Sequence, residues 1–439
     1  MVLINKEKRL YIDAFWVLAG QFVSGLALLA GIRILTELVS PDVYGQVALF
    51  NGFVALGVAV FSYPFICAGM RILPECADSQ RYDLLMQQIY YLTTRSIFVA
   101  IAIFLSIGGV YCLGSKDNFW LFVLASLLLV VTVRRELGVQ LLIGDRQHRN
   151  ASLWQITDSI IRPLFAIMMV WYVGNHVEWI LFGYVLAGVT ANLPANCFRR
   201  KHEQSENQQA PVIKSKFGQE ILAYALPLIP MELIFWINGL GDRYVIGYMM
   251  TAADVGLYAA TYTIINEAFN RSAMVLLRTF QPVYFQLFSA EQRTKSYQTL
   301  WTWIFCTICL GVLGVVIVDF TKQWLSELLL AKSYHTSVEL MTVIAGGCAL
   351  NALGTVLSQP LLARKQTKLV LLGRTSGVLT AAIAIPVLVA HFGLFGAALA
   401  NPIYFGVEAF VLGILAKPWR NCQSGFQYQL NNSSIKLTV

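Results

Sequence analysis

Acidic and basic side chains occur inside the longest apolar stretches of this chain, where a charge is expensive and usually functional. Glu267 and Arg271 are four residues apart, as are Asp158 and Arg162, so a helix would place each acid beside its base. An arginine fork can bind phosphate through two parallel hydrogen bonds, and a carboxylate can take up a proton or a cation. These residue types indicate anion binding, cation exchange or structural ion pairs within a membrane.

The composition requires a lipid environment around most of the chain. Hydrophobic residues make up 57% of the 439 residues and charged residues only 13%, which is about half the share typical of soluble domains. Because a spanning helix needs about 20 apolar residues, the sequence predicts an all-α integral membrane protein with twelve transmembrane helices. They are expected at residues 11–36, 42–70, 87–113, 119–143, 152–173, 178–198, 219–240, 252–283, 297–319, 338–362, 368–391 and 394–416.

A polar segment divides the predicted helices into two groups of six. We expect an N-terminal lobe at 1–198, a cytoplasmic linker at 199–218, a C-terminal lobe at 219–418 and a cytoplasmic tail at 419–439. Most of the 32 Lys and Arg residues fall in alternate loops, which predicts that both termini are cytoplasmic. Two six-helix lobes that start on the same side are parallel repeats, and such repeats in transporters hold the substrate at their interface.

The basic loops also account for most of the net charge of +8, so we expect contact with anionic lipid headgroups and not with nucleic acid. The apolar stretch from Leu10 to Leu35 is too long for a signal peptide and lacks a cleavage site of small residues, so we expect a retained first span. Cys306 and Cys309 form a C-x-x-C motif within a predicted span, without a neighbouring His or carboxylate. We therefore expect no metal site and no cofactor.

A short motif occurs once in each half of the chain. Arg33 precedes an Asp-Val-Tyr-Gly sequence ending at Gly45, and Arg243 precedes an Asp-Val-Gly sequence ending at Gly256, with Arg-to-Gly spacings of 12 and 13 residues. We expect a Ser-Pro-Asp sequence with Ser40 as the cap, and a Thr-x-x-Asp capping box, to start the following helices. Capping does not explain the two arginines, which could contact a substrate or close a gate near the outer mouth.

Several segments resemble one family of bacterial membrane proteins. The resemblance is carried by Arg33-Ile-Leu-Thr-Glu-Leu-Val-Ser-Pro-Asp-Val-Tyr-Gly-Gln-Val-Ala, Tyr224-Ala-Leu-Pro-Leu-Ile-Pro, Trp236-Ile-Asn-Gly-Leu-Gly-Asp-Arg-Tyr, Asp254-Val-Gly-Leu-Tyr-Ala-Ala and Phe392-Gly-Leu-Phe-Gly-Ala-Ala-Leu-Ala. These segments resemble the Wzx-type oligosaccharide flippases, whose superfamily also contains multidrug and toxic-compound exporters. The related lipid II flippases carry two further helices, so the chain looks more like the O-antigen or capsule branch.

The resemblance implies two lobes around a central cavity, and alternating access that carries an undecaprenyl-diphosphate-linked oligosaccharide to the outer leaflet of the bacterial inner membrane. It implies coupling to a cation, no enzymatic step and a functional monomer. The implied partners are this lipid-linked oligosaccharide, membrane lipids, the polysaccharide polymerase and the chain-length regulator. A small-molecule or multidrug cation antiporter of the same superfamily is the alternative.

A substrate of this kind needs cations for its phosphates, amides and hydroxyls for its sugars, and a carboxylate for coupling. The expected diphosphate or sugar contacts are Arg271, Arg278, Arg162, Arg33, Arg374, Arg95 and Asn270. The expected coupling carboxylates are Glu232, Glu267, Glu408 and Asp158.

Each candidate also has a structural interpretation. The two acid–base pairs could neutralise each other on their own helices, and Arg278, Arg374 and Arg95 could extend to the cytoplasmic boundary. Glu232 and Glu408 have no partner nearby in the sequence, so they either pair across helices or serve in coupling. An enzyme acting on the same lipid is disfavoured, because the longest predicted outer loop, about residues 321–337, is short and poor in catalytic groups.

Overall fold

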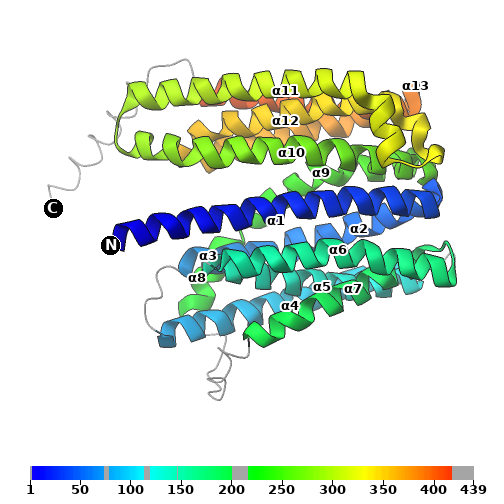
Figure 1. The fold of residues 1–439 in the computed structure, drawn as a ribbon, viewed down its shortest axis with the longest axis horizontal. Coiled ribbons are helices and arrows are strands. Elements are labelled where there is room, and N and C mark those ends of the chain that lie inside the picture. Colours follow the sequence, from blue (N-terminus) through cyan, green and yellow to red (C-terminus); the bar gives the residue numbers. More distant parts are fainter. Residues whose placement is uncertain (1, 74–78, 113–118, 146, 200–215, 418–439) are drawn as a thin grey trace. The chain divides into compact units, whose positions relative to one another are not determined.

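The computed structural model describes residues 2–73, 79–112, 119–145, 147–199 and 216–417 (Figure 1). Most of the predicted linker, and all of the predicted tail, lie outside these residues. The described part of the chain consists of helices joined by short turns and contains no strand.

The helices follow the predicted spans. They are α1 (Val2–Leu38), α2 (Pro41–Phe61), α3 (Tyr63–Ile72), α4 (Ser79–Cys112), α5 (Phe119–Gly144), α6 (His148–Val173), α7 (Val177–Arg199), α8 (Lys216–Ala225), α9 (Leu228–Met249), α10 (Ala252–Ser289), α11 (Arg293–Leu329), the 3₁₀ helix η5 (Lys332–Ser337), α12 (Val338–Ala363) and α13 (Thr367–Ala416). Each predicted span corresponds to one of these helices, to a broken pair of them, or to one arm of α13.

Three interruptions occur where the backbone chemistry permits them. The second predicted span is broken at Ser62, shortly before Pro64, into α2 and α3. The seventh is broken next to Pro227 into α8 and α9, which are bent by 41°. In α13, Gly393 has a φ of 58°, which only glycine adopts freely, and it separates the two arms at the boundary predicted for the last two spans.

The length and hydropathy of the helices identify a multi-pass membrane protein. Seven helical segments of the described chain are long and apolar enough to cross a membrane, or eight if α8 and α9 form one bent span. Large apolar side chains face outward, as they do in lipid: Phe320 is 84% exposed and Trp171 is 77% exposed. A soluble protein would bury such side chains.

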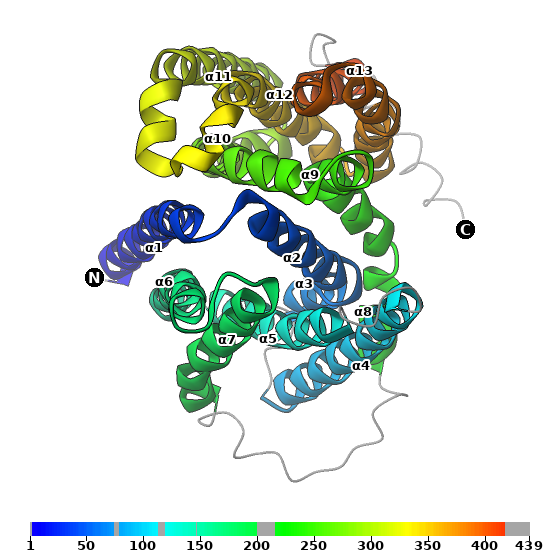
Figure 2. The ribbon, with the colours of Figure 1, turned by 90° about the vertical axis from the view of Figure 1, so that its right-hand side faces the viewer.

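The helices form two compact units. The first comprises Met1–Ile264 and Gln323–Val338, and the second comprises Ile265–Lys322 and Glu339–Val439. In the first unit α6 packs between α1 and α7, α5 also packs on α7, and α2 contacts α9 (Figure 2). In the second unit α10, α11 and α12 lie side by side (Figure 1) and pack around the buried Trp303. Val370 and Leu412, one on each arm of α13, pack with Leu361 of α12.

The two copies of the repeated motif touch each other within the first unit. Gly45 and Gly256 lie near the beginning of α2 and of α10, each four residues after the first residue of its helix. A Cβ atom at Gly45 would overlap the carbonyl oxygen of Ala252, and one at Gly256 would overlap that of Pro41. Glycine is therefore required at both positions for the two backbones to approach this closely. The motif marks a helix crossing as well as two helix starts.

The two helix starts are capped differently. The predicted capping box of α10 is confirmed: the Asp254 N–H donates to Thr251 Oγ1 (3.2 Å), and the Thr251 N–H donates to Asp254 Oδ2 (3.1 Å). At the start of α2 the predicted arrangement is also present: Ser40 is the N-cap residue with an extended backbone, Pro41 opens the helix and Asp42 lies in its first turn, although the Ser40 side chain makes no capping hydrogen bond. The fixed φ of Pro41 already suits the first helical turn.

Candidate functional site

A deeply buried ion pair joins the two arms of α13. Glu408 is completely buried, and one of its carboxylate oxygens accepts a hydrogen bond from Arg374 Nη1. Arg374 also donates to Asn351 Oδ1 at 3.3 Å and to Thr355 Oγ1 at 3.2 Å, both on α12. Glu408 thus has a partner across helices, which is one of the two arrangements expected for it. Arg374 points into the bundle and not toward the membrane boundary.

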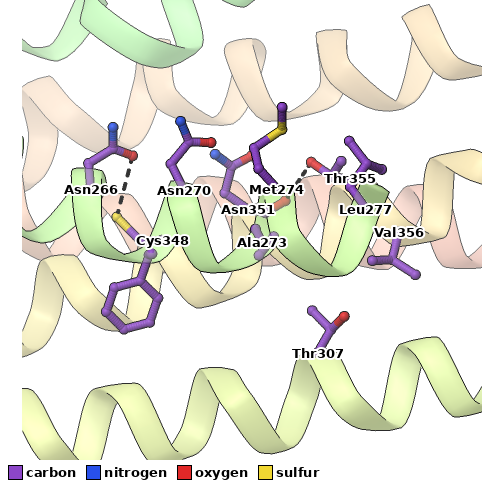
Figure 3. A pocket seen from close by; sticks show the side chains of 12 residues that line it. Asn266, Asn270, Ala273, Met274, Leu277, Thr307, Cys348, Asn351, Thr355 and Val356 are labelled. Atoms are coloured by element: carbon purple, nitrogen blue, oxygen red, sulfur yellow. Dashed lines mark hydrogen bonds between the residues drawn. The ribbon is translucent and has the colours of Figure 1, made fainter. Parts of the chain in front are cut away.

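A cavity of about 60 Å³, lined by both apolar and neutral polar side chains, lies in the second unit beside this ion pair. Figure 3 shows the amides of Asn266 and Asn270 on α10 beside that of Asn351 on α12, with Thr355 one turn further along. Asn266 Oδ1 also accepts a hydrogen bond from the Cys348 thiol at 3.8 Å. The volume accommodates a few water molecules or one small polar substituent. The lining offers neutral donors and acceptors, which suit hydroxyl and amide groups.

The predicted acid–base pair of α10 forms next to this cavity. Arg271 Nη2 donates to Glu267 Oε1, and the two side chains are 28% and 21% exposed. Glu267 follows Asn266 and Arg271 follows Asn270 in the sequence, so the pair lies roughly 100° around α10 from the two cavity-lining amides. Arg278, two turns further along, is exposed.

The corresponding acid on α6 is shared by two arginines. The buried Asp158 accepts a hydrogen bond from Arg135 Nη1 on α5, whereas Arg162 Nε is 4.0 Å from the same carboxylate oxygen. Arg135 also lies 3.5 Å from Glu136. The local pair predicted from the i,i+4 spacing is therefore the weaker of the two contacts. Arg135 lies within α5, inside the span predicted at residues 119–143.

Glu232 differs from the three paired carboxylates. It lies on α9, and within the described part of the chain it makes neither a hydrogen bond nor an ion pair. Its electrostatic neighbours are Tyr63 and Cys67 of α3. A partly buried carboxylate without a cation beside it is free to bind a proton or a small cation.

Arg33 binds the segment that leads into η5. Its Nη1 atom donates to the Leu330 carbonyl oxygen at 2.6 Å and lies 2.8 Å from Glu37. One turn further along α1, Thr36 Oγ1 accepts from the Ala331 N–H at 3.3 Å. Through these contacts the C-terminal end of α1 binds this segment within the first unit.

Arg95 is exposed on α4, with its guanidinium 4.7 Å from the centre of the Tyr91 ring.

Of the predicted substrate contacts, Asn270 lines the cavity, and Arg374 binds two residues that line it. Arg33, Arg95, Arg162 and Arg278 are not among its lining residues. Sequence reasoning missed Asn266, Asn351 and Thr355, although both Asn266/Asn270 and Asn351/Thr355 have the i,i+4 spacing that places residues on one helical face.

Comparison with solved structures gives the class of the fold. A multidrug resistance transporter of the MATE family and MOP superfamily, in an inward-facing conformation, matches with a TM-score of 0.71 over 95% of this chain and 96% of that one, at 14% sequence identity. The lipid II flippase MurJ, in an inward closed conformation, matches with a TM-score of 0.69 over 93% of this chain and 87% of that one, also at 14% identity. The fold is that of multi-pass membrane transporters.

The family follows from the sequence. The model of the family of polysaccharide biosynthesis proteins matches residues 10–288, which is more than half of the chain. The chain therefore belongs to this family. No curated protein matches it.

Proposed function

We propose that this protein carries an undecaprenyl-diphosphate-linked oligosaccharide from the cytoplasmic to the outer leaflet of the bacterial inner membrane. Its membership in the polysaccharide biosynthesis family is the observation that carries the proposal. The likeness of its fold to that of a lipid II flippase supports a lipid-linked substrate. Transport occurs by alternating access of two lobes, 1–198 and 219–418, with both termini in the cytoplasm.

The intramembrane chemistry suits this substrate. A diphosphate with several sugars cannot cross hydrocarbon unaided, because its charges and hydroxyls lose their water. In the second unit the amides of Asn270, Asn266 and Asn351 line the cavity and can bind sugar hydroxyls, and Arg271, which follows Asn270 on α10, is a cation paired with Glu267. Arg374 is held by Glu408, so an anion must compete with that carboxylate to reach it. Arg33, Arg95, Arg162 and Arg278 remain further proposed contacts.

Cation coupling requires a group whose charge changes during the cycle. Asp158, Glu267 and Glu408 are each paired with an arginine. Glu232 has no such partner among the described residues. We therefore assign the coupling role to Glu232 first and regard the other three as structural until tested.

A small-molecule antiporter is the second candidate, favoured by the likeness to the multidrug transporter. The two functions predict different phenotypes on deletion. Loss of a flippase leaves lipid-linked repeat units on the cytoplasmic leaflet and removes the surface polysaccharide, with unchanged drug tolerance. Loss of a drug exporter lowers drug tolerance and leaves the polysaccharide intact. Normal surface polysaccharide in the deletion strain would overturn the proposal.

The polymerase and chain-length regulator are the proposed partners of a monomeric carrier.

A further inference from the structure

Two arginines of the first unit face tyrosine rings. The Arg162 guanidinium on α6 lies 5.8 Å from the centre of the Tyr184 ring on α7, and that of Arg243 on α9 lies 5.6 Å from the Tyr262 ring on α10. Tyr44 on α2 lies between the two pairs in the packing: it packs against the same hydrophobic core as Tyr184, and α2 packs on α9, which carries Arg243. We call these five side chains the arginine–tyrosine row.

The guanidinium of Arg162 is largely unengaged. Its nearest carboxylate, Asp158, is hydrogen-bonded to Arg135, and the 4.0 Å from Arg162 Nε to Asp158 is too long for a hydrogen bond. The Nε atom is buried without a hydrogen-bond partner in the described part of the chain. The side chain is nevertheless 28% exposed, so a ligand can reach the rest of the fork.

The guanidinium of Arg243 likewise has no carboxylate as a hydrogen-bond partner. The adjacent carboxylate, Asp242, accepts hydrogen bonds from the Tyr258 hydroxyl at 2.5 Å and from the Arg243 backbone N–H at 2.8 Å. No carboxylate of the described chain lies within 4.0 Å of the Arg243 guanidinium, and its Nε atom is also buried without a partner. Unpaired cationic donors inside a membrane are costly, and their retention indicates a function.

Two hydroxyl groups add to these donors. Neither Tyr44 nor Tyr184 makes a hydrogen bond through its hydroxyl within the described residues, and both side chains are partly exposed. A diphosphate carries several acceptor oxygens on two phosphorus atoms, so it can engage two arginine forks and two hydroxyls together. A carboxylate or a monophosphate offers fewer oxygens for the same set of donors.

The row has a defined place along the helices. Tyr44 and Tyr262 lie in the first halves of α2 and α10, Tyr184 in the first half of α7, and Arg162 and Arg243 in the second halves of α6 and α9. All five are thus in the helix halves nearest the end where α2 and α10 begin (Figure 1). In the topology proposed above, this end faces the outer leaflet.

We infer that the arginine–tyrosine row is a binding site for the diphosphate of the lipid carrier in the outer half of the pathway. The inference rests on the proposed function for the direction of transport. It assigns substrate contact to Arg243, Tyr44 and Tyr184 in addition to Arg162. The site would hold the headgroup after it has left the cytoplasmic side and before its release.

The test compares lipids that differ only in their headgroup. Purified full-length protein in phosphatidylcholine nanodiscs is titrated with farnesyl diphosphate, farnesyl monophosphate and farnesol, with inorganic pyrophosphate as the competitor. We expect tightest binding of the diphosphate and its displacement by pyrophosphate. Arg162→Gln and Arg243→Gln should each weaken binding of the diphosphate by on the order of tenfold or more, since each removes charge-assisted hydrogen bonds. Tyr44→Phe should weaken it by several-fold.

Matched controls separate the row from general effects of charge. Arg149→Gln removes an exposed arginine from the same helix as Arg162, and Tyr172→Phe alters an exposed tyrosine of that helix. Both variants should bind as the wild type does. Thermal unfolding checks each variant. If a glutamine variant does not fold, the Arg→Lys variant replaces it, and a several-fold loss is expected because lysine cannot form the planar fork.

The inference is overturned if folded Arg162 and Arg243 variants bind farnesyl diphosphate as tightly as the wild type. It is also overturned if these variants lose binding of farnesol to the same degree as binding of farnesyl diphosphate, which would indicate a general loss of lipid contact. A deletion strain with normal polysaccharide, combined with variant-sensitive diphosphate binding, would refute the proposed function and leave the site standing. Stranded repeat units, together with row variants that bind and export normally, would refute the site alone.

Discussion

Individual charged residues within the helices differ in the ion pairs and hydrogen bonds that they make. Arg374 and Glu408 form an ion pair in the buried interior, and Asn351 and Thr355 accept further hydrogen bonds from the arginine. Glu232 has no hydrogen-bonding or ionic partner in the described part of the chain. A paired charge contributes to the structure even when it also serves transport, whereas an unpaired one is available to a ligand or a proton. The two kinds should respond differently to substitution.

We expect Arg374→Ala to destabilise the protein by about 3–5 kcal/mol, because it leaves the carboxylate of Glu408 buried without a cation. The midpoint of thermal unfolding in detergent measures the loss. The double variant Arg374→Met with Glu408→Leu should recover most of it, since neither charge is then buried alone. An unchanged midpoint in Arg374→Ala would show that the pair does not hold the arms of α13 together.

For Glu232→Gln we expect nearly normal stability but a loss of gradient dependence. The substitution keeps the size of the side chain and removes the group that can change charge, and no described ion pair is broken. Transport into inverted vesicles is measured with and without an imposed proton or sodium gradient. Wild-type export should accelerate with the correct gradient, and the variant should be insensitive to it. A variant that still responds like the wild type would exclude Glu232 from coupling.

At the scale of helices, the spans were predictable and their partners were not. The length of an apolar run is a local property, so it located the spans, including the boundary between the last two spans where the structure has Gly393. Helical spacing shows only partners three or four residues away. Arg374 and Glu408 are 34 residues apart, and Arg135 and Asp158 are 23 apart, so their pairing depends on how the helices pack.

The crossing of α2 and α10 provides a test of helix packing. We expect Gly45→Ala to destabilise the protein by about 1–3 kcal/mol, because its methyl group would overlap the carbonyl oxygen of Ala252, and backbone cannot move aside easily. Gly239→Ala on α9 is the matched control, since a Cβ there meets nothing within 4 Å. The control should leave stability unchanged or raise it by up to about 1 kcal/mol, as alanine favours a helix. Equal unfolding temperatures for the two variants would contradict the crossing.

For the whole molecule, the repeated motif marks one end of the first unit, and the membrane orientation decides which leaflet that end faces. The crossing at Gly45 and Gly256 brings the start of a helix from each half of the chain to the same end of the first unit. The arginine–tyrosine row lies in the helix halves next to that end. Which face of the membrane this end adjoins decides whether the row receives the headgroup late or early in transport. Orientation is therefore the property on which the direction of the proposed mechanism depends.

Orientation can be measured with reporter fusions. Alkaline phosphatase forms its disulfides only outside the cytoplasm, whereas green fluorescent protein fluoresces when it folds in the cytoplasm. We expect a fusion after Lys417 to be fluorescent and without phosphatase activity, because the basic loops favour cytoplasmic termini. A fusion after Ser40, between α1 and α2, should show the opposite, and one at Gln147, between α5 and α6, should match Lys417. Active phosphatase after Lys417 would show that the membrane orientation is the opposite of the predicted one. The arginine–tyrosine row would then lie on the side from which the substrate enters.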